Sequence, residues 1–255
     1  EKVGNNYVTL LAGDVHFRYG NVHFYADHAE MRQAERQVTL LGNAKAENDS
    51  VLATAHRITY FDYSAHLEMA ENAYLQFSNS EQYISMNADD IEYSFDDEAV
   101  EASGNLCGKD HNRMMTLYAK KGYYNINKQY GFFDGNVIIE SRQENDSLLT
   151  LSTDHIDLLQ SAHKAAASGN VQVRYQGVVI TAEQMLYQLD SRRSLFVGNP
   201  LVRRDEMEGR SEQLIFYFDA KNQIDKIELF QNAHVISVNE TKADTARAEK
   251  ITLHV

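Results

Sequence analysis

The chain has 255 residues, 43% of them hydrophobic and only one a proline, which is enough apolar content for a packed core and unlike a disordered chain. Its 24 basic and 37 acidic residues leave a net charge of -13, which disfavours a nucleic-acid partner because phosphate backbones are bound by clustered Lys and Arg. The single cysteine, Cys107, excludes an intrachain disulfide, and no apolar run approaches the roughly 20 residues that a membrane-spanning helix needs.

A short doublet, usually Gly-Asn, recurs eight times along the chain at intervals of 29 to 34 residues. A second landmark follows each doublet by 13 to 18 residues: a small residue with a large apolar one five positions later, as in Ala55 and Tyr60. Two anchors repeated in this way predict one elongated repeat domain over residues 1–255. The doublets are Gly13-Asp14, Gly42-Asn43, Glu71-Asn72, Gly104-Asn105, Gly135-Asn136, Gly169-Asn170, Gly198-Asn199 and Gln231-Asn232.

Apolar residues alternate with polar ones in 22–26, 38–46, 84–88, 133–139, 149–153, 167–175 and 178–182, which is the period of half-buried strands. After each small residue of the second landmark the apolar phase slips, which requires a bulge or a corner. Segments 61–64, 95–98, 125–128, 189–192 and 219–222 have turn composition. The sequence therefore predicts an all-β fold of eight two-strand repeats, about sixteen long bent antiparallel strands.

The first doublet residue is in phase with the apolar residues of its strand. We therefore expect the glycine to face inward and the asparagine outward, at a bend where the backbone closely approaches another group. Glu71 and Gln231 replace the glycine in two repeats. At these two places we expect the stack of strands to open or to end.

The doublet motif resembles the OstA/LptA-like family of lipopolysaccharide transport proteins over nearly the whole chain. The resemblance is carried by Leu11-Ala12-Gly13-Asp14-Val15 with Ala26-Asp27, Gly135-Asn136-Val137 with Thr153-Asp154, and Ser168-Gly169-Asn170-Val171 with Ala182-Glu183-Gln184-Met185-Leu186-Tyr187. It implies an elongated open β-jellyroll, a trough whose apolar interior shields the acyl chains of lipid A in the periplasm. It also implies end-to-end strand addition, either to other lipopolysaccharide transport components or in a homo-oligomer.

A trough of this kind needs apolar surface only, since removing hydrocarbon from water is worth roughly 25 cal/mol per Å². Packing of the same residues in a closed core is an equally open interpretation. The candidate lining consists of the inward series of the strands: Val15, Phe17, Phe24, Leu75, Phe77, Ile84, Met86, Met115, Leu117, Val137, Ile139, Leu149, Leu151, Val171, Val173, Val178 and Ile180.

Enzyme chemistry has weak support in this sequence. The histidines His111, His155, His163, His234 and His254 are scattered over different repeats without metal-ligand spacing, and the acid pairs Asp89-Asp90, Asp96-Asp97 and Glu206 with Glu208 lie near turns, where solvated surface is the usual role. We therefore expect a non-enzymatic protein with no cofactor and no metal. The alternatives are a polysaccharide-binding or polysaccharide-acting β-helix-type protein, whose repeats are usually shorter, and a structural rod.

The remaining expectations concern the two ends and the processing of the chain. The family resemblance implies a periplasmic chain with its signal peptide removed. Because the sequence begins at Glu1 rather than Met, we expect a mature or trimmed chain, or a fragment of a longer protein, and the missing signal peptide does not indicate a compartment. Strand-like segments at 7–11 and 251–255 favour association through the ends. Asp49-Ser50-Val51, Asp146-Ser147-Leu148 and Asp244-Thr245-Ala246 are similar to the acceptor for periplasmic O-glycosylation in Bacteroidetes-type bacteria, although turn chemistry explains them equally well.

Overall fold

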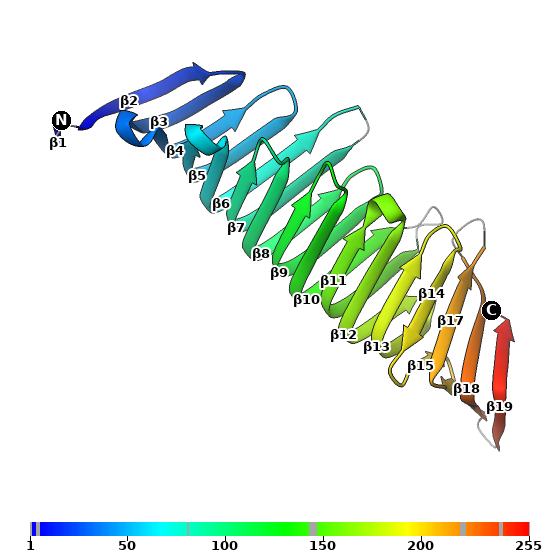
Figure 1. Cartoon of the computed structure of the whole chain (residues 1–255). Coiled ribbons are helices and arrows are strands. Elements are labelled where there is room, and N and C mark those ends of the chain that lie inside the picture. The colour runs from blue at the N-terminus through cyan, green and yellow to red at the C-terminus, as the bar shows by residue number, and fades with distance from the viewer. Residues whose placement is uncertain are drawn as a thin grey trace. The chain divides into compact units, whose positions relative to one another are not determined.

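The computed structural model describes residues 2–3, 6–80, 82–142, 147–219, 223–239 and 242–254. In these ranges the chain consists of antiparallel strands joined by tight turns, with short 3-10 turns as the only helical elements (Figure 1). The all-β prediction is confirmed. None of the described helical elements has the length and apolar character needed to cross a membrane. The chain divides into two compact units, Glu1–Lys128 and Gln129–Val255.

The first unit contains strands that pair with their neighbours in chain order, together with two 3-10 turns, η1 (Gln33–Glu35) and η2 (Asp62–Ser64). A short β1 (Lys2–Val3) pairs with the start of β2. The long strands are β2 (Asn6–Tyr19), β3 (Val22–Arg32), β4 (Gln37–Glu47), β5 (Val51–Phe61), β6 (His66–Ser78), β7 (Tyr83–Ser94), β8 (Ala99–Asp110) and β9 (Met115–Asn125).

The second unit has the same plan and one 3-10 turn, η3 (Gln160–Ala162). Its strands are β10 (Tyr130–Arg142), β11 (Leu148–Leu159), β12 (Lys164–Tyr175), β13 (Val178–Gln188), β14 (Arg193–Val197), β15 (Leu201–Arg204), β16 (Met207–Arg210), β17 (Gln213–Phe218), β18 (Ile224–Asn239) and β19 (Lys242–His254). Since β14 and β15 both pair with β13, and β16 and β17 both pair with β18, each couple is one bent strand in two halves. Each unit thus has eight long strands, sixteen in all, as predicted.

The long strands bend at the doublets. The pairing register shifts there, for example between Leu41 and Ala44 where β4 pairs with β5. Both doublet residues are left-handed, with φ of 72° at Gly42 and 46° at Asn43. Two such residues opposite one residue of the neighbouring strand form a bulge that turns the strand. The phase slip expected after the second landmark lies on that neighbouring strand, where Ala55 and Ile58 are both buried.

The bends divide each unit into two arms. In the first unit, arm A comprises residues 15–26, 44–55, the described residues of 73–88, and 106–119, and arm B comprises 6–12, 28–41, 57–70, 90–103 and 121–125. In the second unit, arm A comprises the described residues of 137–153, 171–182, 201–210 and 233–248, and arm B those of 130–134, 155–168, 184–197, 213–230 and 250–254.

The expected orientation of the doublet glycine is wrong. A Cβ atom added to Gly42 would lie 2.5 Å from Oδ2 of Asp27, an exposed residue of the preceding strand, so this position faces an acidic side chain and not the interior. Asn43 donates a hydrogen bond from Nδ2 to the same carboxylate at 3.1 Å. The corner therefore needs a glycine for room, an asparagine as donor and an acid as acceptor, which explains why these three residue types recur together.

The expectation that the stack opens or ends at Glu71 and Gln231 is also wrong. Both residues are exposed and left-handed, with φ of 66° and 62°, and strand pairing continues on both sides of each. A polar side chain directed into solvent can occupy this backbone conformation at modest cost. These positions are ordinary corners without the glycine.

The predicted turns at 61–64, 95–98, 125–128 and 189–192 are found at the ends of arm B strands, the first of them largely as η2. Of the segment 219–222, residues 220–222 lie outside the described residues, as does Asp146 of the second Asp-Ser tripeptide. In the first such tripeptide the side chain of Asn48 accepts hydrogen bonds from the backbone N–H groups of Ser50 and Val51, which is turn chemistry.

Candidate functional site

The seventeen predicted lining residues all lie on arm A of their units, where buried and exposed positions alternate. Thirteen of them are buried. The other four, Phe17, Ile84, Met115 and Leu149, are partly exposed and lie close to the turns that join arm A strands. The set therefore forms one apolar wall in each unit, with its most accessible members at the rim.

The opposite wall, on arm B, was missing from the sequence-based lining. The sequence nevertheless marked this wall, because the large residue of the second landmark lies on arm B. Tyr60, Tyr93, Tyr124 and Phe216 are all buried there. Other buried members of this wall are Leu40, Ile58, Leu67, Met69, Ile91 and Val100 in the first unit, and Phe133, Ile156, Met185, Phe196, Leu214, Ile227 and Leu229 in the second.

The two walls of a unit meet through side chains. In the first unit the ring of Phe24 on arm A lies 5.2 Å from that of Tyr60 on arm B. In the second unit a Cβ added to Gly209 on arm A would lie 3.0 Å from Cδ2 of Leu229 on arm B. The strand ladders, by contrast, connect residues of one arm to residues of the same arm. Separating the walls would therefore expose apolar surface without breaking a ladder.

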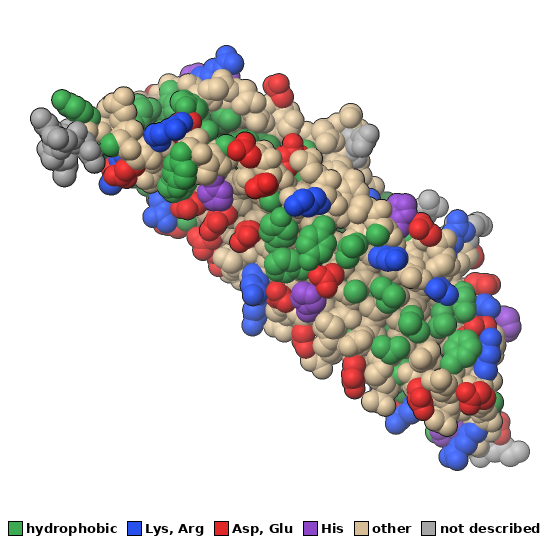
Figure 2. All heavy atoms as spheres, viewed as in Figure 1, with side chains coloured by type: hydrophobic (Ala, Val, Ile, Leu, Met, Phe, Trp, Pro, Cys, Tyr) green, Lys and Arg blue, Asp and Glu red, His purple; other side chains and the backbone are tan. Residues whose placement is uncertain are grey.

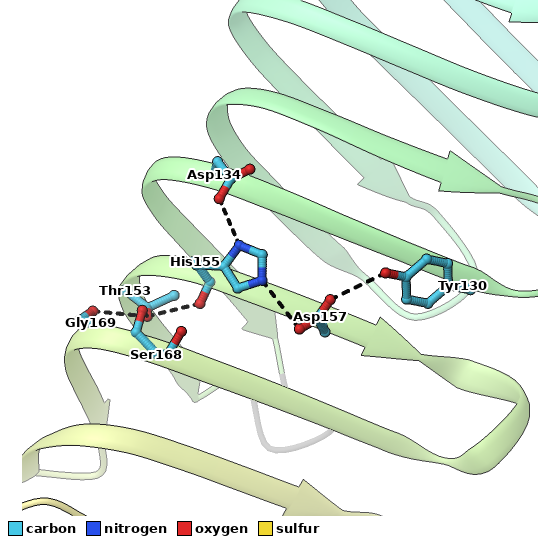
Figure 3. Close-up of polar contacts among 7 residues, drawn as sticks. All are labelled: Tyr130, Asp134, Thr153, His155, Asp157, Ser168 and Gly169. Carbon is cyan, nitrogen blue, oxygen red and sulfur yellow. Dashed lines mark hydrogen bonds and ion pairs between the residues drawn. The ribbon is translucent and has the colours of Figure 1, made fainter.

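The interior disfavours charge. Burial raises the pKa of Tyr93, Tyr124 and Tyr187, because each ionised phenolate would lose hydration in an apolar environment. A buried polar group near the corner is satisfied locally: the hydroxyl of Thr153 lies 2.9 Å from the carbonyl oxygen of Ser168 and 3.0 Å from that of Gly169 (Figure 3). This geometry suits a hydrocarbon ligand better than a charged or sugar ligand.

The outward-facing side chains are of mixed type. On the face drawn in Figure 2, acidic, basic and histidine side chains are interspersed with small groups of hydrophobic ones. Each of the predicted acid pairs has a structural partner on the exterior. Asp89 accepts from Asn105 at 3.0 Å, Asp97 accepts from the hydroxyl of Ser94 at 3.4 Å, and Glu208 lies between Arg203 and Arg210, whose hydrogen bonds lower its pKa.

One histidine belongs to a polar cluster on the second unit. His155 of β11 lies between two carboxylates, with Nδ1 2.6 Å from Asp134 Oδ1 and Nε2 3.2 Å from Asp157 Oδ2, and Asp157 in turn is 3.4 Å from the hydroxyl of Tyr130 (Figure 3). The hydrogen bond to Asp134 is the main cause that raises the pKa of His155. The cluster stabilises a protonated imidazole on the sheet surface.

The other candidate histidines are not brought together with it. His163 pairs with Asp190 at 2.7 Å, and His111 lies 2.9 Å from the hydroxyl of Ser85, while His234 and His254 lie on β18 and β19. Within the described ranges no three His, Cys, Asp or Glu side chains are arranged to hold a metal ion.

Two family models match the chain. A model described as LptA/(LptD N-terminal domain) LPS transport protein matches residues 3–99, and one described as lipopolysaccharide-assembly, LptC-related, matches residues 74–199. The matches overlap and together extend over residues 3–199. A search of curated proteins found no match.

Among solved structures, the chain is similar to LptH from Pseudomonas aeruginosa, the LptA homologous periplasmic component of the lipopolysaccharide transport device in that organism. The identity is 15% and the TM-score 0.41, over 45% of this chain and 82% of that one.

Proposed function

The chain belongs to the LptA/OstA-like lipopolysaccharide transport family, and we propose that it carries lipopolysaccharide through the periplasm by holding the acyl chains of lipid A between arm A and arm B. The observation that carries this proposal is the pair of apolar walls. The two walls contact each other through side chains, while the strand ladders connect residues within one arm. The seventeen arm A residues predicted from the sequence would form one side of the binding surface, and the buried aromatic and aliphatic residues of arm B the other.

Hydrocarbon between the walls needs no directional chemistry. Each methylene taken out of water contributes about 0.8 kcal/mol, and an acyl chain between the arms would replace contacts such as Phe24 with Tyr60 by equivalent ones. The proposal therefore requires no catalytic residue, no cofactor and no metal. It depends on the arms separating far enough to admit the chains.

The unpaired edges of the sheet support the proposal that partner chains bind by strand addition. The arm A half of β2 is paired with β3 alone among the described strands, and β19 with β18 alone. Unpaired edges are templates for strand addition by another chain. We propose that other lipopolysaccharide transport components, or a second copy of this chain, pair with these edges.

The last strand is held to its neighbour by a buried carboxylate. Glu228 of β18 is 5% exposed and lies 2.9 Å from Nζ of Lys250 on β19, 3.0 Å from Nζ of Lys226 and 2.9 Å from the hydroxyl of Tyr217 on β17. Burial alone would raise the pKa of Glu228, but these three hydrogen bonds outweigh it and hold the pKa at about 2. The contact of Lys250 with Glu228 adds to the ladder that pairs β19 with β18, and in this proposal β19 is the platform for an incoming strand.

Photocrosslinking from adjacent residues on one strand tests the lipid proposal. Ile139 is 6% exposed and belongs to the arm A wall, while its neighbour Ile138 is 37% exposed and faces outward. With a photoreactive amino acid at each position in turn, we expect lipopolysaccharide to crosslink to position 139 and not to position 138.

A second pair, Val173 and Gln172, repeats the comparison on β12, in case the first interior variant does not fold. Folding of each variant is checked by circular dichroism. Equal crosslinking from inner and outer positions, or none from the inner positions of folded variants, would refute lipid binding between the arms.

A further inference from the structure

The tips of the two arms touch at one point on the rim of the first unit. Tyr19, the last residue of β2, lies at the tip of arm A, and its ring lies 5.9 Å from that of Tyr60, close to Asp62 of η2 at the tip of arm B. The carboxylate of Asp62 raises the pKa of the Tyr19 hydroxyl. Arg36, in the neighbouring turn, donates from Nε to Oδ2 of Asp62 at 2.7 Å. The three side chains form a polar clasp between the arms.

The clasp covers the seam where the two apolar walls meet. The ring of Tyr19 lies 5.9 Å from that of Tyr60, which lies 5.2 Å from Phe24 beneath it. Exposure falls along this series from 48% at Tyr19 to 8% at Tyr60 and 0% at Phe24. Tyr19 is thus the outermost layer between solvent and the apolar interior.

The arm B side of the clasp is internally tied. The backbone N–H of Asp62 donates to the carbonyl oxygen of Arg36 at 3.0 Å, so these two turns are linked independently of Tyr19. Tyr19, by contrast, lies at the end of a strand half that is paired with β3 alone among the described strands. Exposed ion pairs and hydrogen bonds are individually weak. The contact can therefore open by movement of the β2–β3 tip, while the strand pairing within arm A and within arm B stays intact.

We propose that Tyr19 is a latch that closes the lateral entrance to the apolar interior of the first unit, and that it must release Asp62 before an acyl chain can pass between the arm tips. This inference rests on the proposed function, because a latch has a role only if lipid enters the interior. It assigns the place of entrance to the rim between β2–β3 and η2.

Reversible crosslinking across the arm tips tests the latch. In a Cys107→Ala background of the full chain, Tyr19→Cys and Asp62→Cys are joined with a short bismaleimide whose linker contains a cleavable disulfide. We expect the crosslinked protein to take up fluorescent lipopolysaccharide at least tenfold more slowly than the same protein after cleavage of the linker with reductant.

The matched control joins Arg36→Cys to Asp62→Cys in the same background, which ties two turns of arm B and leaves the arms free to separate. This crosslink should leave the uptake rate within twofold of the uncrosslinked value. Tyr19→Phe, which keeps the ring and removes the hydroxyl, should load faster than the unmodified chain.

The possible failures are distinguishable. Unchanged uptake in the crosslinked Tyr19–Asp62 variant, with photocrosslinking from Ile139 still positive, would overturn the latch and leave the proposed function standing. Equal slowing by both crosslinks would also overturn the latch, because the effect would not depend on joining the arms. If the unmodified chain takes up no lipopolysaccharide, the proposed function and the latch fail together.

Discussion

The corner geometry predicts that Gly169→Ala is more destabilising than Gly177→Ala, although both glycines have nearly the same backbone conformation, with φ of 78° and 79°. Gly169 lies within β12, and Gly177 lies in the turn between β12 and β13. They differ in surroundings. A Cβ at Gly177 meets nothing within 4 Å, whereas a Cβ at Gly169 would lie 2.5 Å from Oδ2, and 2.9 Å from Cβ, of Asp154.

The magnitude follows from two contributions. A left-handed conformation costs a residue with a Cβ roughly 1–2 kcal/mol, which is the whole expected effect of Gly177→Ala. At Gly169 the carboxylate of Asp154 can rotate away only by losing the hydrogen bond from Asn170, and its Cβ cannot move without the backbone. Overpacking of this kind adds about 1–3 kcal/mol. We therefore expect Gly169→Ala to lower the free energy of unfolding by about 2–5 kcal/mol.

Hydrogen exchange of the β11 and β12 amides is the suitable assay, because repeats of this kind can unfold locally and a single global transition would average over them. Adding Asp154→Ala to Gly169→Ala should recover the part of the clash due to the carboxylate, and leave the cost of the conformation and of the 2.9 Å contact with the Cβ of residue 154. Equal effects of the two glycine substitutions, or a double variant no more stable than Gly169→Ala, would refute the proposed role of the acid at the corner.

The remaining predictions concern the interior, an edge and the surface. Ile180→Asp places a carboxylate at a fully buried position and should reduce the free energy of unfolding by several kcal/mol in urea titrations, whereas Val179→Asp, at the partly exposed neighbouring position, should cost at most about 1 kcal/mol. The folded pKa of Glu228 lies below its ordinary value of 4.5, so its contribution is present above about pH 4.5 and is lost as the pH falls through about 2; Glu228→Gln should destabilise the chain at neutral pH, and the difference from the unmodified chain should shrink in acid. The pKa of His155 is raised above 6.5, so its contribution is complete below pH 6.5 and is lost as the pH rises through the folded pKa; an NMR titration should give a lower pKa for this ring in Asp134→Asn.

The strands and corners were predictable because their signal is local. Alternation in 38–46 and the phase slip after Ala26 reflect side-chain direction along one strand, and the doublets mark each bend. The orientation of Gly42 was not predictable in the same way. Two consecutive left-handed residues interrupt the pleat, so the parity that holds at Leu40 does not say where a Cβ at position 42 would point.

The second wall was missed for a different reason. That Tyr60 on arm B faces Phe24 on arm A depends on the angle through which the strands bend, and no periodicity within a strand encodes this angle. The same is true of Tyr19 and Tyr60, whose rings belong to different repeats and different arms. Contacts between the arms require coordinates, although Tyr60 itself was already marked by the second landmark.

Each unit contains two kinds of contact with different roles: polar contacts at the corners and apolar contacts between the arms. At the corner, glycine, asparagine and acid fit together in several repeats, with hydrogen bonds such as Asn105 to Asp89 at 3.0 Å and Asn170 to Asp154 at 2.8 Å, so the bend is held by specific polar geometry on the outside. Between the arms, apolar side chains meet without geometric demands. Such contacts can be exchanged for hydrocarbon at little net cost, while a change at the corner would disturb the ladder on both sides. Widening of the interior should therefore occur at the rim, with the corners as fixed hinges. Substitutions at corner residues should accordingly alter stability with little effect on lipid uptake, and substitutions at rim residues the reverse.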